Sequence, residues 1–152
     1  MKEIYYTYNN EAIASCIFLE ILQNVDSIDI ARSCLILPFL LDDRTVRHFQ
    51  CISNEEKISL EYITKEQPSL FTSFNKRYLS LLPITINSLI ILNKNNQIGI
   101  TSSGIFAKSE FLHGETDMGY RFTEIKKALP VFLRMIEKYT TVQLYRILKI
   151  QL

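Results

Sequence analysis

The stretch from Glu11 to Asn24 constrains the fold most, because it reads as a helix that is apolar nearly all the way round. Asn9 or Asn10 is placed to cap its first turn, and Glu11 favours the helix dipole there. Its apolar residues cover more than one face: Ala12, Ile13, Cys16, Ile17, Phe18, Leu19, Ile21 and Leu22. Such a helix lies either at the centre of a core or against a partner.

Apolar residues at three- and four-residue spacings predict further helices along the first half of the chain. The predicted segments are residues 28–41, capped from Asp26, Ser27 or Asp29; residues 44–48, capped by Asp42 or Asp43; residues 55–65; and residues 69–81. Pro38 is expected to kink or end the first of these, and Pro68 to close the third.

A new segment is expected to start at Pro83, which suits the first position of a helix. Residues 84–93 carry many β-branched side chains, so both a helix and a strand remain open there. After a polar turn at residues 94–97, apolar residues on both sides of residues 101–104 predict a short β-hairpin. A helix followed by a hairpin is the layout of a winged-helix unit, and many α+β folds share it. Residues 110–120 read as a loop.

The best-patterned helix runs from Phe122 to Ile136, interrupted by Pro130, so that it either kinks there or starts later. Thr140 or Thr141 is expected to cap a final helix. The sequence therefore predicts a predominantly helical α+β fold, a helical bundle with a short β-hairpin, of which a winged-helix-like arrangement is one version. Residues 1–152 contain no linker that would divide them, so a single domain is expected.

Composition points to a packed cytoplasmic protein. The 152 residues are 47% hydrophobic with 4 Gly, which excludes disorder, and the net charge of +1 provides no strong field toward nucleic acid or membranes. No signal-like apolar core follows Met1, and the longest apolar run, residues 35–41, is far too short to span a membrane. Three scattered cysteines suggest a reducing compartment.

No pattern for catalysis, metal binding or cofactor binding occurs in the sequence. The two histidines, His48 and His113, lie near no nucleophile motif, and no metal-ligand spacing or glycine-rich phosphate loop is present. Cys16 and Cys34 lie in apolar helical patterns, where buried structural thiols are expected. We therefore expect no enzyme activity, no metal and no cofactor.

Charge is distributed unevenly along the chain. Residues 120–152 carry seven basic and two acidic side chains, a net charge of +5. This is either a solvated outer face or an electropositive surface for an acidic partner. The candidate partner-binding residues are Arg44, Arg47, His48, Lys126, Lys127, Arg134, Lys138 and Arg146. In a winged-helix arrangement, nucleic acid could contact Lys76, Arg77, Lys94 and Lys108.

The most specific segment is residues 35–47, Leu-Ile-Leu-Pro-Phe-Leu-Leu-Asp-Asp-Arg-Thr-Val-Arg. It resembles the Leu-Pro-Leu-x-Leu-x-Lys-x-Thr-Arg-like segment of the middle components of three-component ABC systems, which include the Lamassu antiphage defences. Three further features follow the family's order: an early helix at residues 10–24, the segment Phe-Asn-Lys-Arg-Tyr-Leu-Ser-Leu-Leu-Pro-Ile-Thr at residues 74–85, and a helix pair at residues 126–150.

This resemblance implies a non-catalytic assembly or regulatory subunit of a bacterial antiphage defence complex. Such a subunit would bridge an SMC- or Rad50-like ABC ATPase and an effector, often a nuclease, and ATP hydrolysis and DNA cutting would belong to those partners. The alternative is a DNA-binding winged-helix regulator, against which the near-zero net charge weighs. A small hydrolase or nuclease has almost no support in the sequence.

Overall fold

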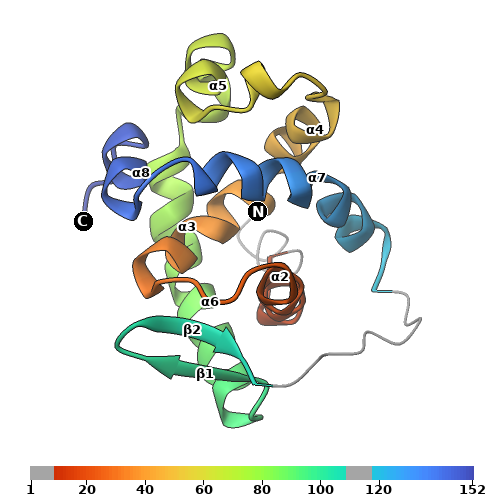
Figure 1. Ribbon diagram of the computed structural model, residues 1–152, viewed down its shortest axis with the longest axis vertical. Coiled ribbons are helices and arrows are strands. Elements are labelled where there is room, and N and C mark those ends of the chain that lie inside the picture. The colour runs from red at the N-terminus through yellow and green to blue at the C-terminus, as the bar shows by residue number, and fades with distance from the viewer. Residues whose placement is uncertain (1–8, 109–117) are drawn as a thin grey trace.

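Helices α2 (Glu11–Asn24) and α3 (Ile30–Leu40) form the central layer of the computed structural model, which describes residues 9–108 and 118–152 (Figure 1). On one side α6 (Phe74–Lys94) packs against both of them. On the other side α7 (Tyr120–Glu137) packs against α2, and α4 (Asp43–Cys51) packs against α3 and α7. Because α2 is covered from two sides, its apolar surface extends around most of the helix.

Both central helices begin at a side-chain cap. The Asn10 side chain accepts hydrogen bonds from the backbone N–H groups of Ala12 and Ile13, and Asp29 accepts one from Arg32 at 2.8 Å. Helix α3 passes through Pro38 and ends at Leu40, one residue before the predicted end at Leu41.

The chain between α4 and α6 is made of short pieces. The 3₁₀ turn η1 (Glu55–Lys57) precedes α5 (Leu60–Glu66), and η2 (Pro68–Leu70) follows it. The expected single helix over residues 55–65 was therefore wrong. The break falls at Ile58, which is buried in the core, and Ser59 then caps α5 by accepting a hydrogen bond from the Tyr62 N–H at 3.1 Å.

Helix α6 runs through Pro83 without a break, so the expected new segment at Pro83 and its strand version were both wrong. The proline lies on the exposed side of the helix, whereas residues before and after it are buried on the side facing α2 and α3. The loss of one backbone hydrogen bond is thus offset by packing along the whole length of α6.

Strands β1 (Ile98–Thr101) and β2 (Gly104–Ala107) form the predicted antiparallel hairpin, with Ile98 paired to Ala107. The Ile28 N–H donates to the Ile105 carbonyl at 3.0 Å and the Ile105 N–H donates to the Ile28 carbonyl at 2.8 Å. These bonds anchor the hairpin to the connection between α2 and α3. Gly104 has φ +137° and a Cβ there would lie 2.6 Å from the Ile28 oxygen, so the close approach requires glycine.

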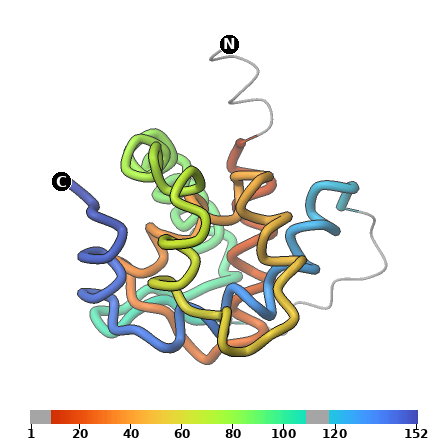
Figure 2. Tube along the Cα trace, turned by 90° about the horizontal axis from the view of Figure 1, so that it is seen from above, coloured from red at the N-terminus to blue at the C-terminus, as the bar shows by residue number. Residues whose placement is uncertain are grey.

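Helix α7 passes through Pro130, which is exposed, and α8 (Thr141–Ile147) follows it after a sharp turn. Thr140 caps α8 in a capping box with Gln143, as one of the two predicted caps. Arg32 of α3 holds this turn by donating to Thr141 Oγ1 at 3.1 Å and to the Ile136 carbonyl at 3.3 Å. Figure 2 shows α8 at one end of the molecule, near the carboxyl terminus.

Phenylalanine rings join the layers at the centre of the core. The Phe39 ring lies 4.8 Å from that of Phe74 and 5.3 Å from that of Phe132, and Phe49 lies 6.2 Å away, between centroids. All four side chains are buried. The cluster therefore connects α3, α4, α6 and α7. Within residues 9–108 and 118–152, no helix combines the length and apolarity that a membrane span requires.

We expect Phe39→Ala to lower the free energy of unfolding by about 3–5 kcal/mol, because it leaves a cavity among three other rings. Urea denaturation followed by circular dichroism measures this loss. Val142→Ala, at a side chain that is 67% exposed, should change it by less than about 0.5 kcal/mol. Equal effects of the two substitutions would contradict the central role of the ring cluster.

Candidate partner-binding site

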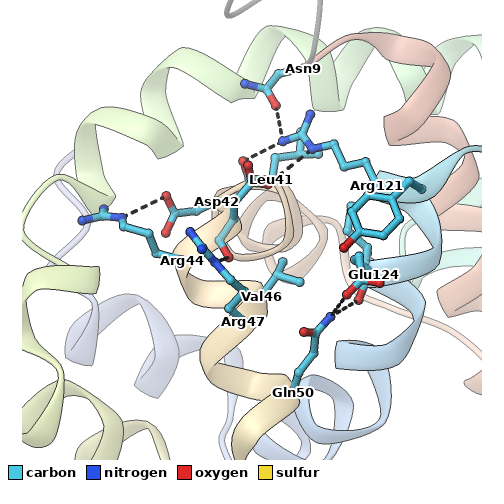
Figure 3. A pocket seen from close by; sticks show the side chains of 12 residues that line it. Asn9, Leu41, Asp42, Arg44, Val46, Arg47, Gln50, Arg121 and Glu124 are labelled. Atoms are coloured by element: carbon cyan, nitrogen blue, oxygen red, sulfur yellow. Dashed lines mark hydrogen bonds and ion pairs between the residues drawn. The ribbon is translucent and has the colours of Figure 1, made fainter.

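An open hollow of about 990 Å³ lies between α4 and the first turns of α7 (Figure 3). We call it the α4–α7 groove. It is lined by Asn9, Leu41, Asp42, Asp43, Arg44, Val46, Arg47, Gln50, Tyr120, Arg121, Glu124 and Ile125. Both charge signs and an apolar floor are present, a composition that suits contact with another polypeptide.

The start of α4 forms one edge of the groove. Asp42 caps this helix by accepting hydrogen bonds from the Thr45 N–H at 3.2 Å and the Thr45 hydroxyl at 2.6 Å. Thr45, Val46 and Phe49 are buried, so they form the inner side of the helix. Arg44 and Arg47 lie on its exposed side. Helix α4 is therefore amphipathic, with a buried side and an exposed basic side. We call the exposed basic side, with Arg44 and Arg47, the α4 ridge.

At one end of the groove, the Arg121 side chain joins α7 to the residues before α2 and α4. Its Nη2 donates to Asn9 Oδ1 at 2.9 Å and to the Leu41 carbonyl at 3.0 Å, and its Nε lies 3.5 Å from Asp43 Oδ1. One guanidinium therefore connects α7 with the approach to α2 and with the junction of α3 and α4. Figure 3 shows this side chain reaching across the groove toward Leu41 and Asn9.

At the other end of the groove, hydrogen bonds between Gln50 and Glu124 join α4 to α7. Gln50 Nε2 donates to the Glu124 carbonyl at 2.8 Å and to Glu124 Oε2 at 2.9 Å. Lys127 Nζ donates to Glu124 Oε1 at 2.9 Å, and this bond, followed by the bond from Gln50, lowers the pKa of the Glu124 carboxyl. The same contact raises the pKa of Lys127. The groove is thus held at both ends by side chains of α4 and α7.

Arg44, Arg47 and Tyr120 present polar and aromatic surface along the groove. Arg44 is about half exposed and lies 3.7 Å from Asp42, while Tyr120 is 81% exposed. Arg47 Nε donates to the Asp43 carbonyl within its own helix, 3.4 Å away. Exposed arginine and tyrosine side chains on a rigid frame are the residue types that contribute most at protein interfaces.

A smaller hollow of about 370 Å³ lies on the other side of α4, lined by Arg44, Arg47, His48, Cys51, Gln67, Ser69 and Leu70. Burial lowers the pKa of His48, which favours the neutral imidazole. Arg44 and Arg47 line both hollows, so the α4 ridge is open on its two flanks.

Residues 2–152 match the family described as ABC-three component (ABC-3C) system Middle Component 3. The chain belongs to this family. No curated protein and no solved structure matches it. Membership makes this middle component one part of a system of several components.

The predicted contact segment Arg44, Arg47 and His48 is brought together on the α4 ridge. Arg134 and Lys138, which were predicted from the basic C-terminal third, do not line either hollow beside it. Arg134 pairs with Glu55 at 2.8 Å, and Lys138 lies 3.6 Å from Glu55 and donates to the Ile58 carbonyl at 2.5 Å. The positive charge of these two helix positions is thus partly balanced by the segment around η1.

The other basic residues predicted for partner binding lie apart from one another. Lys126 is exposed with its Nζ 5.7 Å from the Phe122 ring centroid, Lys127 pairs with Glu124, and Arg146 is exposed on α8. Of these three, Lys127 contacts a residue of the groove, Glu124.

The residues predicted for nucleic-acid contact occupy two regions. Arg77 is half-buried and donates to the Pro38 carbonyl at 3.2 Å and the Leu70 carbonyl at 3.0 Å, so its guanidinium joins α6 to α3 and η2. Lys76 and Lys94 are exposed at opposite ends of α6, and Lys108 is exposed after β2.

Five residues of the groove were not predicted as partner-binding residues from the sequence: Asn9, Gln50, Tyr120, Arg121 and Glu124. Arg121 was counted only as one of the seven basic residues of the C-terminal third. The contact of Arg121 with Asn9 and Leu41 cannot be predicted from sequence spacing, because these residues are far apart in the chain and meet only in the folded protein. In the described ranges, 9–108 and 118–152, no group of three or more His, Cys, Asp or Glu side chains is arranged to hold a metal ion.

We expect Arg121→Met to lower the free energy of unfolding by about 1.5–3 kcal/mol, because two charge-assisted hydrogen bonds are lost and their partly buried acceptors remain. Denaturant titration measures this. Arg146→Met, at an exposed position of α8, is the matched control and should cost less than about 0.5 kcal/mol. If the two variants were equally stable, Arg121 would not fasten the groove.

Proposed function

We propose that this middle component is a non-catalytic assembly and regulatory subunit of a bacterial antiphage defence complex of the Lamassu type. It would bridge an SMC- or Rad50-like ABC ATPase and an effector, often a nuclease, in the cytoplasm. The observation that carries the proposal is the α4–α7 groove, whose exposed Arg44, Arg47 and Tyr120 are mounted on a frame fixed at both ends.

The frame supports a binding role because its contact residues need little ordering when a partner arrives. The α4 helix is tied to α7 through Gln50 and Glu124, and α7 is tied to the α3–α4 junction through Arg121. Binding energy is then not spent on ordering the backbone. The exposed guanidinium groups of Arg44 and Arg47 suit a partner surface rich in carboxylates, to which arginine can donate two parallel hydrogen bonds.

We propose that the chain itself carries no catalytic site and binds no cofactor. The groove combines arginines, carboxylates and an exposed tyrosine, and its lining contains neither a histidine nor a cysteine, serine or threonine nucleophile. In the second hollow, His48 and Cys51 both contribute to the lining, but no hydrogen bond between these two described residues orients them as base and nucleophile. Catalysis would belong to the other components.

The DNA-binding alternative draws support from the order of α6 and the hairpin, which is the order of a winged-helix unit. Two observations favour the assembly role over it. The outward face of α6 is largely apolar, and Arg77 donates to carbonyls within the protein. An apolar helix face suits protein contact better than contact with a phosphate backbone.

The paired charge reversal Arg44→Glu/Arg47→Glu tests the proposal. When the chain is co-expressed with the other components of its own system, we expect the double variant to lose at least about tenfold in affinity for one of them, because two exposed cations facing the partner become anions. Purification through a tag on the partner, followed by surface plasmon resonance, measures the loss.

Lys57→Glu/Lys65→Glu is the matched control, since both lysines are exposed and lie outside the groove. It should bind like the wild type. If the isolated wild-type chain instead bound duplex DNA with affinity falling steeply as salt rises, and joined no complex, the regulator alternative would replace the assembly role.

A further inference from the structure

The outward face of α6 carries a row of apolar side chains. Leu79, Ile86 and Ile90 are 49%, 48% and 45% exposed, and Pro83 between them is exposed as well. We call these four residues the α6 stripe. Their spacing of four, three and four residues keeps them within about 60° of one another around the helix, over three turns. Ile91, 44% exposed, widens the stripe on one side.

The opposite face of the same helix is buried. Tyr78, Leu81, Leu89 and Leu92 are 6% exposed or less and face the layer formed by α2 and α3. The helix is therefore held rigidly with its apolar stripe turned outward. Single exposed apolar residues are ordinary, whereas a contiguous row on one fixed helix marks an interaction surface.

A lysine lies beyond each end of the stripe. Lys76 and Lys94 are separated by 18 residues, which is five helical turns, so both project on the same side of α6, about 27 Å apart. Both are exposed, and neither forms an ion pair with any residue in the described part of the chain. Near the middle of the stripe, the Glu11 carboxylate accepts a hydrogen bond from Asn87 at 3.2 Å.

This charge arrangement disfavours a second copy of the chain as the occupant. In an antiparallel pairing of two α6 stripes, Lys76 of each copy would face Lys94 of the other, and in a parallel pairing each lysine would face itself. Like charges placed opposite one another oppose association, whereas carboxylates at those two points would favour it.

We propose that the α6 stripe binds an amphipathic helix of another component of the same system, with apolar residues at heptad spacing and an acidic residue near each end. The proposal rests on the assembly role proposed above and adds a second contact surface to it. Helices α2 and α3 separate α6 from α4 and α7, so two partners can be held on opposite sides of the central layer (Figure 1).

The test is Ile86→Asp/Ile90→Asp in the complex formed with the other components of the system. Both side chains are half-exposed, so the fold should be retained, which circular dichroism and the melting temperature verify. We expect at least about tenfold weaker binding of one component, because two carboxylates replace apolar contacts at the centre of the stripe. Val142→Asp, at a more exposed apolar position on α8 (67%), is the control and should bind like the wild type.

Charge reversal tests the identity of the occupant. Lys76→Glu/Lys94→Glu should weaken the same contact by at least about threefold at low salt, since two attractive pairs become repulsive. Added salt should then narrow the difference between variant and wild type, because it screens the attraction in one and the repulsion in the other. A photo-crosslinking amino acid at position 86 should join the chain to a helical segment with acidic residues at its ends. Binding unchanged by both double variants, or a crosslink to a basic segment or to a second copy, would overturn the proposal.

Three further outcomes would also overturn it. Binding to vesicles of phosphatidylcholine and phosphatidylglycerol (7:3) that Ile86→Asp/Ile90→Asp abolishes would assign the stripe to a membrane surface. If the α6 variants assemble normally while Arg44→Glu/Arg47→Glu does not, the assembly role stands and the α6 proposal fails. If the wild-type chain joins neither of the other components, both fail.

Discussion

Burial of α2 and α3 between two outer layers is the constraint on which the rest of the structure depends. Each of these helices has more apolar surface than one neighbour can cover, so the chain must supply cover on two sides. Helix α6 provides one cover, and α4 with α7 provides the other. The Phe39 ring cluster extends across these layers and fixes their spacing.

The three-layer arrangement leaves two outward surfaces of different character. The α4–α7 groove is charged and is fixed by Arg121 and Gln50, whereas the α6 stripe is apolar with a lysine beyond each end. A subunit that joins two other proteins needs two separate surfaces, and chemically different surfaces help it to discriminate between its partners. Family membership makes the chain one part of a system of several components, and the bridging role that we propose rests on these two surfaces.

Periodicity and caps predicted most of the fold. Asn10, Asp42 and Thr140 were each one of two neighbouring residues expected as a cap, because their side chains can accept backbone hydrogen bonds locally, and each does so. The hairpin followed from its turn residues. The prediction at Pro83 was wrong, because the local effect of proline is the loss of one hydrogen bond, whereas α6 is stabilised by packing along its 21 residues. That packing cannot be read from the residues next to Pro83. The candidate groove was predicted only in part. Arg44 and Arg47 were expected from their polar segment, whereas His48 of the same segment lines the smaller hollow. The contacts of Arg121 and Gln50 that hold the groove join residues more than 70 positions apart, which no local pattern predicts.

We propose that this chain holds the other components of its system together. Native mass spectrometry of those components, co-expressed with and without the chain, tests it most directly. We expect a single assembly containing all components when the chain is present, and separate components when it is omitted. If the remaining components formed the same assembly without it, the chain would not be the bridging subunit.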